Sequence, residues 1–345
     1  MVIERDYRGE AVTANLPTIA MIGCGGTISS VAQSSLDTLD YPEHGRKLSV
    51  EQLLERLPEA RLVADPVVIP FRSIGSSAMT PTDWIELRDL IQRVATDRPG
   101  IDGFVVLHGT ATLEETAYFL DLTLDLANPV VLVGAQRPFS AVSSDASMNI
   151  ISTLRIAGSR EARGKGVLVT LNDEIHAARN VAKTSSYRLQ AFQSPEYGLL
   201  GQVDADRVRF FRAPLHRHAP DSEFAAPKVA KMPRVDIVYS YAGVDATFIE
   251  AAIAAGARGI VSAGLAPGLP TPPERVALER AVTGGITVVQ CTRVLSGRVA
   301  RRQYLQDAGI VAGNDLSPQK ARILLSLALA RSMNPGEIAD LFDVY

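Results

Sequence analysis

The chain has 345 residues, which favours two domains because single hydrophobic cores seldom grow beyond about 250–300 residues. Hydrophobic residues make up 46% of it, and 35 Lys and Arg against 38 Asp and Glu give a formal net charge of -3, without a basic stripe of the kind that binds nucleic acid. No segment is long and apolar enough to span a membrane, and the scattered charges of the first seventeen residues do not resemble a signal peptide, so we expect a cytoplasmic protein.

In the first part of the chain, short apolar runs alternate with amphipathic stretches that begin with helix-capping signals. Ser49 is followed three residues later by Gln52, Pro81 stands at a first helical position, and Thr112 precedes Glu115 in capping-box spacing. The runs predict strands at 18–23, 67–71, 103–107, 130–133 and 166–170. Strand–helix alternation of this kind indicates a parallel sheet with helices on both faces.

Near residues 211–233 the pattern changes to Pro, His and charged residues, which is typical of a linker. A second alternating set follows, with strands predicted at 235–239, 259–262 and 287–290 and helices at 246–255, 272–282 and 318–331. We therefore expect two α/β domains: a larger N-terminal one over 1–212 and a smaller C-terminal one over 234–345, joined by a linker at 213–233.

Cysteine and histidine usage indicates neither a disulfide framework nor a metal site. Cys24 and Cys291 are far apart and outside any C-x-x-C pattern, so we interpret them as buried reduced thiols. The 5 histidines lack the spacing of zinc ligands. We predict no metal and no organic cofactor.

Ligands of open parallel sheets bind at the carboxyl ends of the strands, which selects the loops 23–30, 74–80 and 108–115. In the first loop, Gly25 and Gly26 allow a sharp turn, and Thr27 follows just past the strand end. Ile28 stands where a dinucleotide fingerprint needs its third glycine, so that interpretation fails. A hydroxyl group placed here is either a nucleophile or a simple cap of the next turn.

The loop 108–115 also follows a strand and opens a helix, whose N-terminus suits a carboxylate or a developing oxyanion. A hydroxyl nucleophile needs a base, and Lys183 in the polar segment 180–185 is the most suggestive lysine. The alternative for a lone lysine in such a segment is a solvated charge.

Gly-Gly-Thr-Ile at 25–28 and His-Gly-Thr-x-Thr-x-Glu-Glu-Thr at 108–116 resemble the two signature motifs of the bacterial L-asparaginase and glutaminase family. The segments 131–138, 171–184, 259–264 and 317–322 resemble the same family in order, so the likeness covers almost the whole chain. It implies a flavodoxin-like larger domain, a smaller α/β domain, and a homotetramer built as a pair of intimate dimers. It also implies that a neighbouring subunit completes each site.

Carried over by position, the resemblance implies an amidohydrolase in which the Thr27 hydroxyl attacks the side-chain amide carbon, assisted by Tyr41 on the loop after the first motif. Thr110 and Lys183 form a second hydroxyl–base pair. Such a site splits hydrolysis into two easier steps through an acyl-enzyme, and fixed N–H groups stabilise the oxyanion. The implied substrate-binding positions are Gly26, Ser76, Ser77, Gly109, Ala111 and Arg302.

Three departures from the family pattern fall on groups that recognise an α-ammonium. Ala111 stands where the family has Asp, Ser77 where it has Gln, and Arg302 where the neighbouring subunit usually supplies Glu. Ser76, the expected α-carboxylate contact, is kept. Because an unpaired buried charge costs on the order of several kcal/mol, such a site offers an ammonium little compensation.

We therefore expect the substrate to be a small amide, imide or lactam that lacks an α-ammonium. Such a substrate either carries a carboxylate or has none. One alternative is an ordinary L-asparaginase that releases aspartate and ammonia. The others are a variant disabled by substitution and a catalytically silent homologue that binds a small acid.

Overall fold

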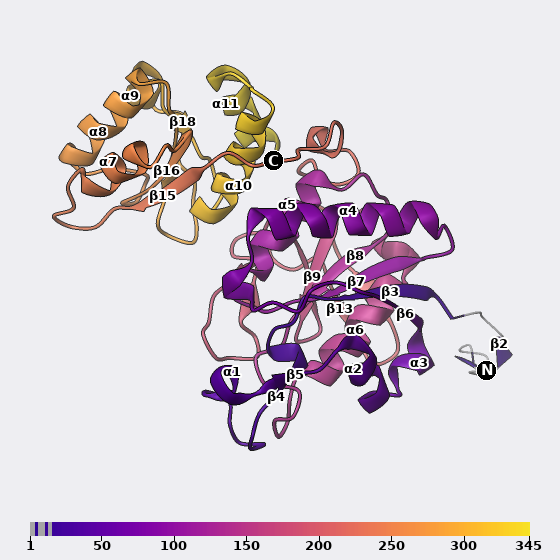
Figure 1. The fold of residues 1–345 in the computed structure, drawn as a ribbon. Helices are drawn as coiled ribbons and strands as arrows, with labels where there is room; N and C mark the ends of the chain where they lie inside the picture. The colour runs from indigo at the N-terminus through magenta and orange to yellow at the C-terminus, as the bar shows by residue number, and fades with distance from the viewer. Residues whose placement is uncertain (1–3, 6–10, 13–15) are drawn as a thin grey trace. The chain divides into compact units, whose positions relative to one another are not determined.

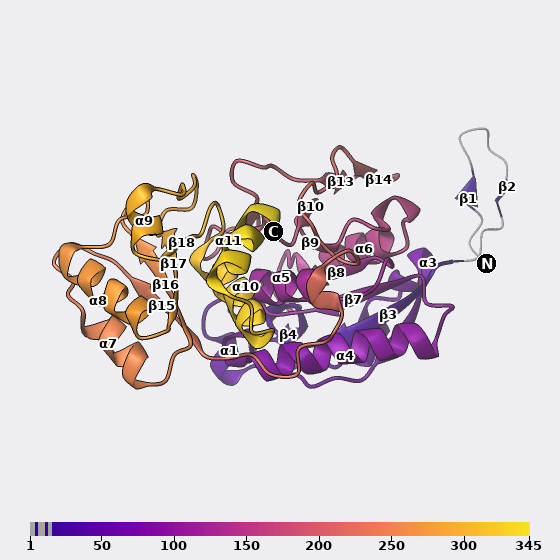
Figure 2. The ribbon, with the colours of Figure 1, turned by 90° about the horizontal axis from the view of Figure 1, so that it is seen from above.

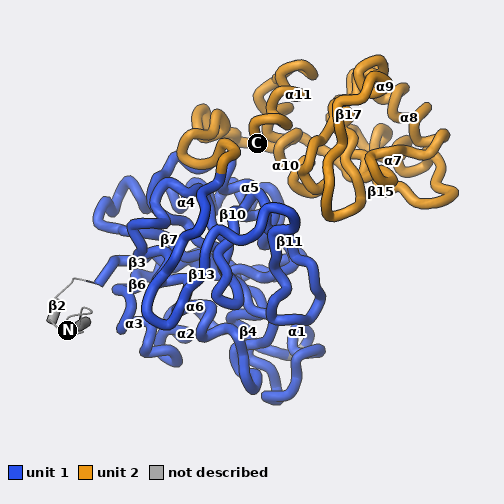
Figure 3. The backbone as a smooth tube through the Cα atoms, turned by 180° about the vertical axis from the view of Figure 1, so that it is seen from behind, with its two compact units in different colours: residues 1–214 blue, residues 215–345 orange. Residues whose placement is uncertain are grey.

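The computed structural model describes residues 4–5, 11–12 and 16–345, and the chain divides into two compact units, residues 1–214 and 215–345 (Figure 3). Both units are α/β, as predicted. The linker expected at 213–233 remains a prediction. Within the described ranges, no helix has both the length and the apolar character needed to cross a membrane.

The first unit is built on a sheet with the strand order β14-β13-β10-β9-β8-β7-β3-β6. Five neighbouring strands are parallel, as predicted: β6 (Asp65–Ile69), β3 (Thr18–Gly23), β7 (Gly103–Leu107), β8 (Val130–Val133) and β9 (Val167–Leu171). An antiparallel extension follows, which the apolar pattern did not predict: β10 (Glu174–Ala177), β13 (Gly201–Val203) and β14 (Val208–Phe210). The hairpin from β9 to β10 turns at Asn172 and Asp173, whose φ values of 53° and 61° suit a two-residue turn.

Helices cover both faces of this sheet (Figure 1). The helices α4 (Pro81–Asp97) and α5 (Leu113–Thr123) pack together on one face. On the other lie α2 (Val50–Arg56), α3 (Ala60–Val63) and α6 (Ala146–Ala157). Consecutive crossovers through α5 and α6 run in the same direction along the sheet but on opposite faces, so they have opposite hands, a departure from the usual right-handed rule.

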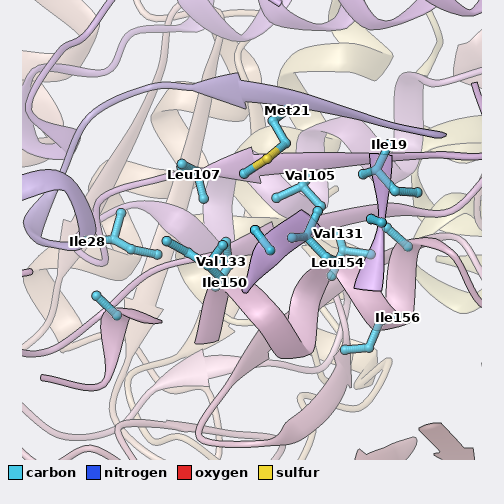
Figure 4. Close-up of a cluster of buried hydrophobic side chains, with 14 of the residues drawn as sticks. Ile19, Met21, Ile28, Val105, Leu107, Val131, Val133, Ile150, Leu154 and Ile156 are labelled. Atoms are coloured by element: carbon cyan, nitrogen blue, oxygen red, sulfur yellow. The ribbon is translucent and has the colours of Figure 1, made fainter. Parts of the chain in front are cut away.

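One hydrophobic core cluster of the first unit lies between the sheet and α6 (Figure 4). Alternate residues of β3, β7 and β8 point to this side and meet Ile150 and Leu154 of α6, because strand side chains alternate between faces. Ile28 joins the same cluster and is fully buried. Full burial of such a side chain stabilises the fold by about 1.5–3 kcal/mol, so the residue after Thr27 anchors the first loop in the core.

Two small hairpins flank the carboxyl edge of the sheet. In one, β4 (Ser30–Val31) pairs with β5 (Arg46–Lys47), and the segment between them contains the short helix α1 (Tyr41–His44). In the other, β11 (Ala182–Lys183) pairs with β12 (Phe192–Gln193). The described terminal strands β1 (Glu4–Arg5) and β2 (Ala11–Val12) pair with each other.

The capping signals are confirmed in two of three cases. Ser49 and Gln52 form a capping box at the start of α2, and Pro81 occupies the first turn of α4. The box predicted for Thr112 and Glu115 is wrong: α5 starts after Thr112, but the Thr112 side chain makes no cap hydrogen bond. Its hydroxyl instead donates to the Ser76 carbonyl at 2.8 Å, because a neighbouring loop offers an acceptor.

The second unit holds a parallel sheet with its strands in chain order: β15 (Val235–Tyr239), β16 (Gly259–Gly264), β17 (Thr287–Thr292) and β18 (Val311–Ala312). On one side lie α7 (Thr247–Ala254) and α8 (Pro272–Thr283), and on the other α10 (Pro318–Ala330) (Figures 1 and 2). The short α9 (Gln303–Asp307) and the last helix, α11 (Pro335–Val344), both pack near β18. Cys24 in the first unit and Cys291 here are buried and free, as predicted.

Candidate active site

The three loops selected from the sequence lie side by side, because β6, β3 and β7 are neighbours in the sheet. Backbone hydrogen bonds join them: Cys24 N–H donates to the Leu107 carbonyl at 2.8 Å, and Ile74 N–H donates to the Cys24 carbonyl at 3.0 Å. The Thr112 hydroxyl donates to the Ser76 carbonyl and so joins the third loop to the second. The loops therefore form one continuous surface at the carboxyl edge of the sheet.

Gly26 and Gly109 are the points at which the first and third loops touch. Gly26 has a φ of 96° and a ψ of -179°, a combination essentially restricted to glycine. A Cβ added to Gly26 would lie 2.3 Å from the Cα of Gly109, and one added to Gly109 would lie 2.5 Å from the Ser76 Oγ. The next residue in each loop carries a hydroxyl, so Thr27 and Thr110 start from adjacent backbone.

Thr27 forms the first hydroxyl pair, with its Oγ1 2.6 Å from the phenolic oxygen of Tyr41. A carboxylate oxygen of Asp37 accepts the Tyr41 N–H at 3.1 Å and holds the start of α1 in place. Burial raises the pKa of Tyr41, and the negative charges of Asp37 and Asp145 raise it further, against the opposing hydrogen bond to Thr27. The phenol therefore keeps its proton at neutral pH.

Thr110 forms the second pair, in which the Lys183 Nζ donates to the Thr110 Oγ1 at 2.7 Å. Pairing between β11 and β12 sets Lys183 opposite Phe192 and fixes the direction of the lysine. Burial lowers the pKa of Lys183, and the charge of Glu114 opposes part of that shift. A lowered pKa makes the neutral amine, which is the form that accepts a proton, more accessible.

The predicted recognition positions differ in exposure. Ser76 is buried, and its Oγ accepts the Ala111 N–H at 3.2 Å. Ser77 and the Ala111 side chain are exposed at the edge of the same surface. Arg302 belongs to the second unit, where it precedes α9, is exposed, and has its guanidinium 5.0 Å from the centre of the Tyr304 ring.

Two groups near the site were missed from the sequence. Glu114, in the first turn of α5, accepts the Lys183 backbone N–H at 3.0 Å through its Oε2. His108 is fully buried and hydrogen-bonds the Gly109 carbonyl at 2.8 Å. Burial lowers the pKa of His108 to about 4, so its ring is neutral. Glu114 and His108 both belong to the motif at 108–116. Their hydrogen-bond partners are set by tertiary packing, which leaves no signal in the local sequence.

A buried hydrogen-bond chain from α4 and α5 supports the third loop, 108–115. The Trp84 Nε1–H donates to the Thr116 Oγ1 at 2.8 Å, and that hydroxyl lies 3.0 Å from the His108 Nε2. Because the hydroxyl accepts from Trp84, it donates to Nε2 and leaves the Nδ1–H for the Gly109 carbonyl. Among the residues that the structure describes, no three His, Cys, Asp or Glu side chains gather as metal ligands.

Two hydroxyl groups, Thr27 beside Tyr41 and Thr110 beside Lys183, therefore start from adjoining loops at the carboxyl edge of the sheet. Residues 18–216 match the N-terminal domain of asparaginases, and residues 234–342 match the glutaminase/asparaginase C-terminal domain. The chain belongs to the asparaginase family and is a hydrolase that acts on amide C–N bonds.

Proteins named as asparaginases are similar to this chain over nearly its whole length. A probable periplasmic L-asparaginase of Haemophilus influenzae is 38% identical over 335 residues, 96% of this chain and 94% of that protein. A glutaminase-asparaginase of Pseudomonas fluorescens is 35% identical over 333 residues, 96% of this chain and 91% of that one. The crystal structure of a probable cytoplasmic L-asparaginase from Campylobacter jejuni superposes with a TM-score of 0.90 at 36% identity, covering 95% of this chain and 100% of that chain.

Proposed function

We propose that the chain cleaves a small amide through an acyl-enzyme, with the Thr27 hydroxyl as the nucleophile. Two paired hydroxyls carry this proposal: the Thr27 Oγ1 lies 2.6 Å from the Tyr41 hydroxyl, and the Thr110 Oγ1 lies 2.7 Å from the Lys183 Nζ. A free hydroxyl is a weak nucleophile and is activated by a neighbouring group that takes its proton. Both pairs lie on loops whose backbones touch, which is the geometry that two consecutive acyl transfers need.

In the first step, the Thr27 Oγ1 bonds to the amide carbon, and its proton passes through the Tyr41 hydroxyl to the leaving nitrogen. The C–N bond breaks, ammonia leaves, and an ester remains on Thr27. Water then attacks the ester, and the Thr110–Lys183 pair accepts the proton of that water. The ester C–O bond breaks, Thr27 regains a proton, and a carboxylic acid leaves. The positive N-terminal end of α5 stabilises negative charge at this loop.

We further propose a substrate without an α-ammonium. Ala111 brings no carboxylate to the exposed edge, and Ser77 brings a short neutral hydroxyl. A cation stands close by: a Cβ on Gly75 would lie 3.9 Å from the Ser77 Oγ and 4.0 Å from the Lys47 Nζ, so both groups flank the same glycine. Positive charge at this edge favours a carboxylated amide over an amino acid amide.

Ordinary L-asparaginase activity is the second candidate, and the names of the relatives favour it. The Haemophilus influenzae protein is named an L-asparaginase, and the Pseudomonas fluorescens protein a glutaminase-asparaginase. In this case other groups would hold the ammonium, and the enzyme would release aspartate and ammonia.

Ammonia release from a panel of amides separates these candidates. The kcat/KM of L-asparagine and L-glutamine is compared with that of succinamate, maleamate and small lactams. A missing charged partner costs on the order of 2–5 kcal/mol, so we expect a preference for amine-free amides of roughly tens- to thousands-fold. Ala111→Asp together with Ser77→Gln should raise activity on asparagine. Efficient wild-type turnover of asparagine, without preference for the amine-free compounds, overturns the shifted specificity.

Thr27→Ala tests the nucleophile. We expect no turnover of any amide, with an unchanged circular dichroism spectrum and thermal midpoint, because the Thr27 side chain is only half-buried and Ile28 still anchors the loop. Wild-type turnover by a folded Thr27→Ala protein would remove Thr27 from the mechanism and leave Ser29 and Ser30 as candidates.

We also propose that the enzyme is a homotetramer of paired intimate dimers, in which Arg302 approaches the Thr27 site of a neighbouring subunit. The family resemblance supports this assembly. An active monomer seen by light scattering at low concentration would refute it. The cytoplasmic name of the Campylobacter jejuni relative supports a cytoplasmic location, and cell fractionation checks it against the periplasmic name of the Haemophilus influenzae relative.

A further inference from the structure

We propose that Glu114 is the positioning residue and counter-ion of Lys183, and that it supplies the negative charge that residue 111 lacks in this chain. The inference rests on the proposed role of the Thr110–Lys183 pair. It assigns to α5 a part in the chemistry beyond the charge of its N-terminus.

Glu114 and Thr110 hold the lysine at its two ends. The Glu114 Oε2 accepts the backbone N–H of Lys183 at 3.0 Å, while the lysine Nζ donates to the Thr110 Oγ1 at 2.7 Å. Glu114 is only 9% exposed, so its carboxylate is largely shielded from water. Because Thr110 and Glu114 are four residues apart across the start of one helix, that helix sets the distance between the hydroxyl and the strand that carries its base.

The charge of Glu114 acts on Lys183 against the effect of burial. The loop 108–112 brings the Thr110 hydroxyl to the Lys183 Nζ, and β12 pairs the apolar Phe192 with the lysine. Burial lowers the pKa of Lys183, whereas the Glu114 charge raises it. The carboxylate therefore limits how far burial neutralises the lysine and sets the pH at which the base becomes available.

Glutamine and alanine at position 114 separate charge from position. Glu114→Gln keeps an oxygen that accepts the Lys183 N–H but removes the charge, so the pKa of Lys183 should fall. The acidic limb of kcat/KM, which reports protonation of the base, should then move to lower pH. Glu114→Ala removes the acceptor as well, and a base displaced by about 1 Å should lower kcat roughly 100-fold.

Asp121→Asn is the matched control. Asp121 is a buried carboxylate of the same helix, and it accepts the Val167 backbone N–H at 2.7 Å. Its neutralisation should leave the acidic limb in place. Ala111→Asp should move the limb to higher pH, and combining it with Glu114→Gln should bring the limb back toward the wild-type position. Equal displacement by Asp121→Asn and Glu114→Gln would show a general effect of removing a buried charge and overturn the proposal.

A readout without turnover keeps this inference separate from the proposed function. The chain has 6 lysines, so the signal of ¹³C-labelled Lys183 can be assigned by its loss in Lys183→Arg. Titration followed by NMR should place the Lys183 transition at lower pH in Glu114→Gln than in wild type. An unchanged transition overturns the role of Glu114. A lack of amide hydrolysis by the wild type overturns the proposed function and leaves the titration to decide this inference alone.

Discussion

A methyl group added to Gly26 would clash with Gly109, where the loops 23–30 and 108–115 touch. The φ of 96° and ψ of -179° at Gly26 cost a residue with a Cβ about 1–3 kcal/mol. The new Cβ would lie 2.3 Å from the Cα and 2.5 Å from the nitrogen of Gly109, backbone atoms that cannot rotate aside. Overpacking of this kind costs about 1–3 kcal/mol. Gly26→Ala should therefore lower the free energy of unfolding by about 2–6 kcal/mol.

Two other glycines of the first unit separate these costs. Gly164 has a φ of 67° but nothing within 4 Å of an added Cβ, so Gly164→Ala should show backbone strain alone, about 1–2 kcal/mol. Gly100 also has open space and no positive φ, so Gly100→Ala should change stability by less than about 0.5 kcal/mol.

Urea unfolding at equal slope gives the three stability changes, and kcat on the best amide gives the effect on the site. Forcing the loops apart shifts Thr27 relative to Thr110, and such misplacement should lower kcat about 100-fold in Gly26→Ala only. If Gly26→Ala loses no more stability than Gly164→Ala and keeps its kcat, the backbones of Gly26 and Gly109 are not in close contact.

Two further substitutions test the groups that support the hydroxyls. Tyr41→Phe removes the oxygen 2.6 Å from Thr27, so kcat should fall about 10²- to 10⁴-fold while KM stays within a few-fold; a normal kcat would exclude Tyr41 from proton transfer. Thr116→Val keeps the shape but leaves the Trp84 N–H and the His108 Nε2 without the hydroxyl that joins them, which should cost about 1–3 kcal/mol in urea unfolding, and an unchanged urea midpoint would contradict the hydrogen-bond chain.

The parallel core of the fold was predictable, whereas its antiparallel edge was not. Strands such as β7 and β8 are buried along their whole length, so they stand out as unbroken apolar runs between capping signals. The short strands β13 and β14 have three residues each, with at least one exposed or half-buried, and no periodicity develops over that length. Their positions depend on turns and pairing partners.

The candidate site also has a part that was predictable from the sequence and a part that was not. The rule for strand ends selected the loops that hold Thr27 and Thr110, because sheet order alone brings those ends together. Lys183 is 73 residues from Thr110, and its place beside that hydroxyl came from family resemblance. Glu114 was visible as part of a motif, but its bond to the Lys183 backbone arises only when β11 packs against α5.

The exposure of Ser77 and Ala111, set against the burial of Gly26 and Gly109, bears on how such an enzyme diversifies. Substitutions at exposed positions usually change stability by less than about 0.5 kcal/mol, whereas the glycines tolerate almost nothing. Side chains at 77 and 111 can therefore be exchanged with little loss of stability, while the close contact of Gly26 and Gly109 keeps Thr27 and Thr110 in place. Substitution is well tolerated at the exposed positions 77 and 111 and poorly tolerated at the buried glycines. Most members of a directed library confined to these two positions should therefore remain folded.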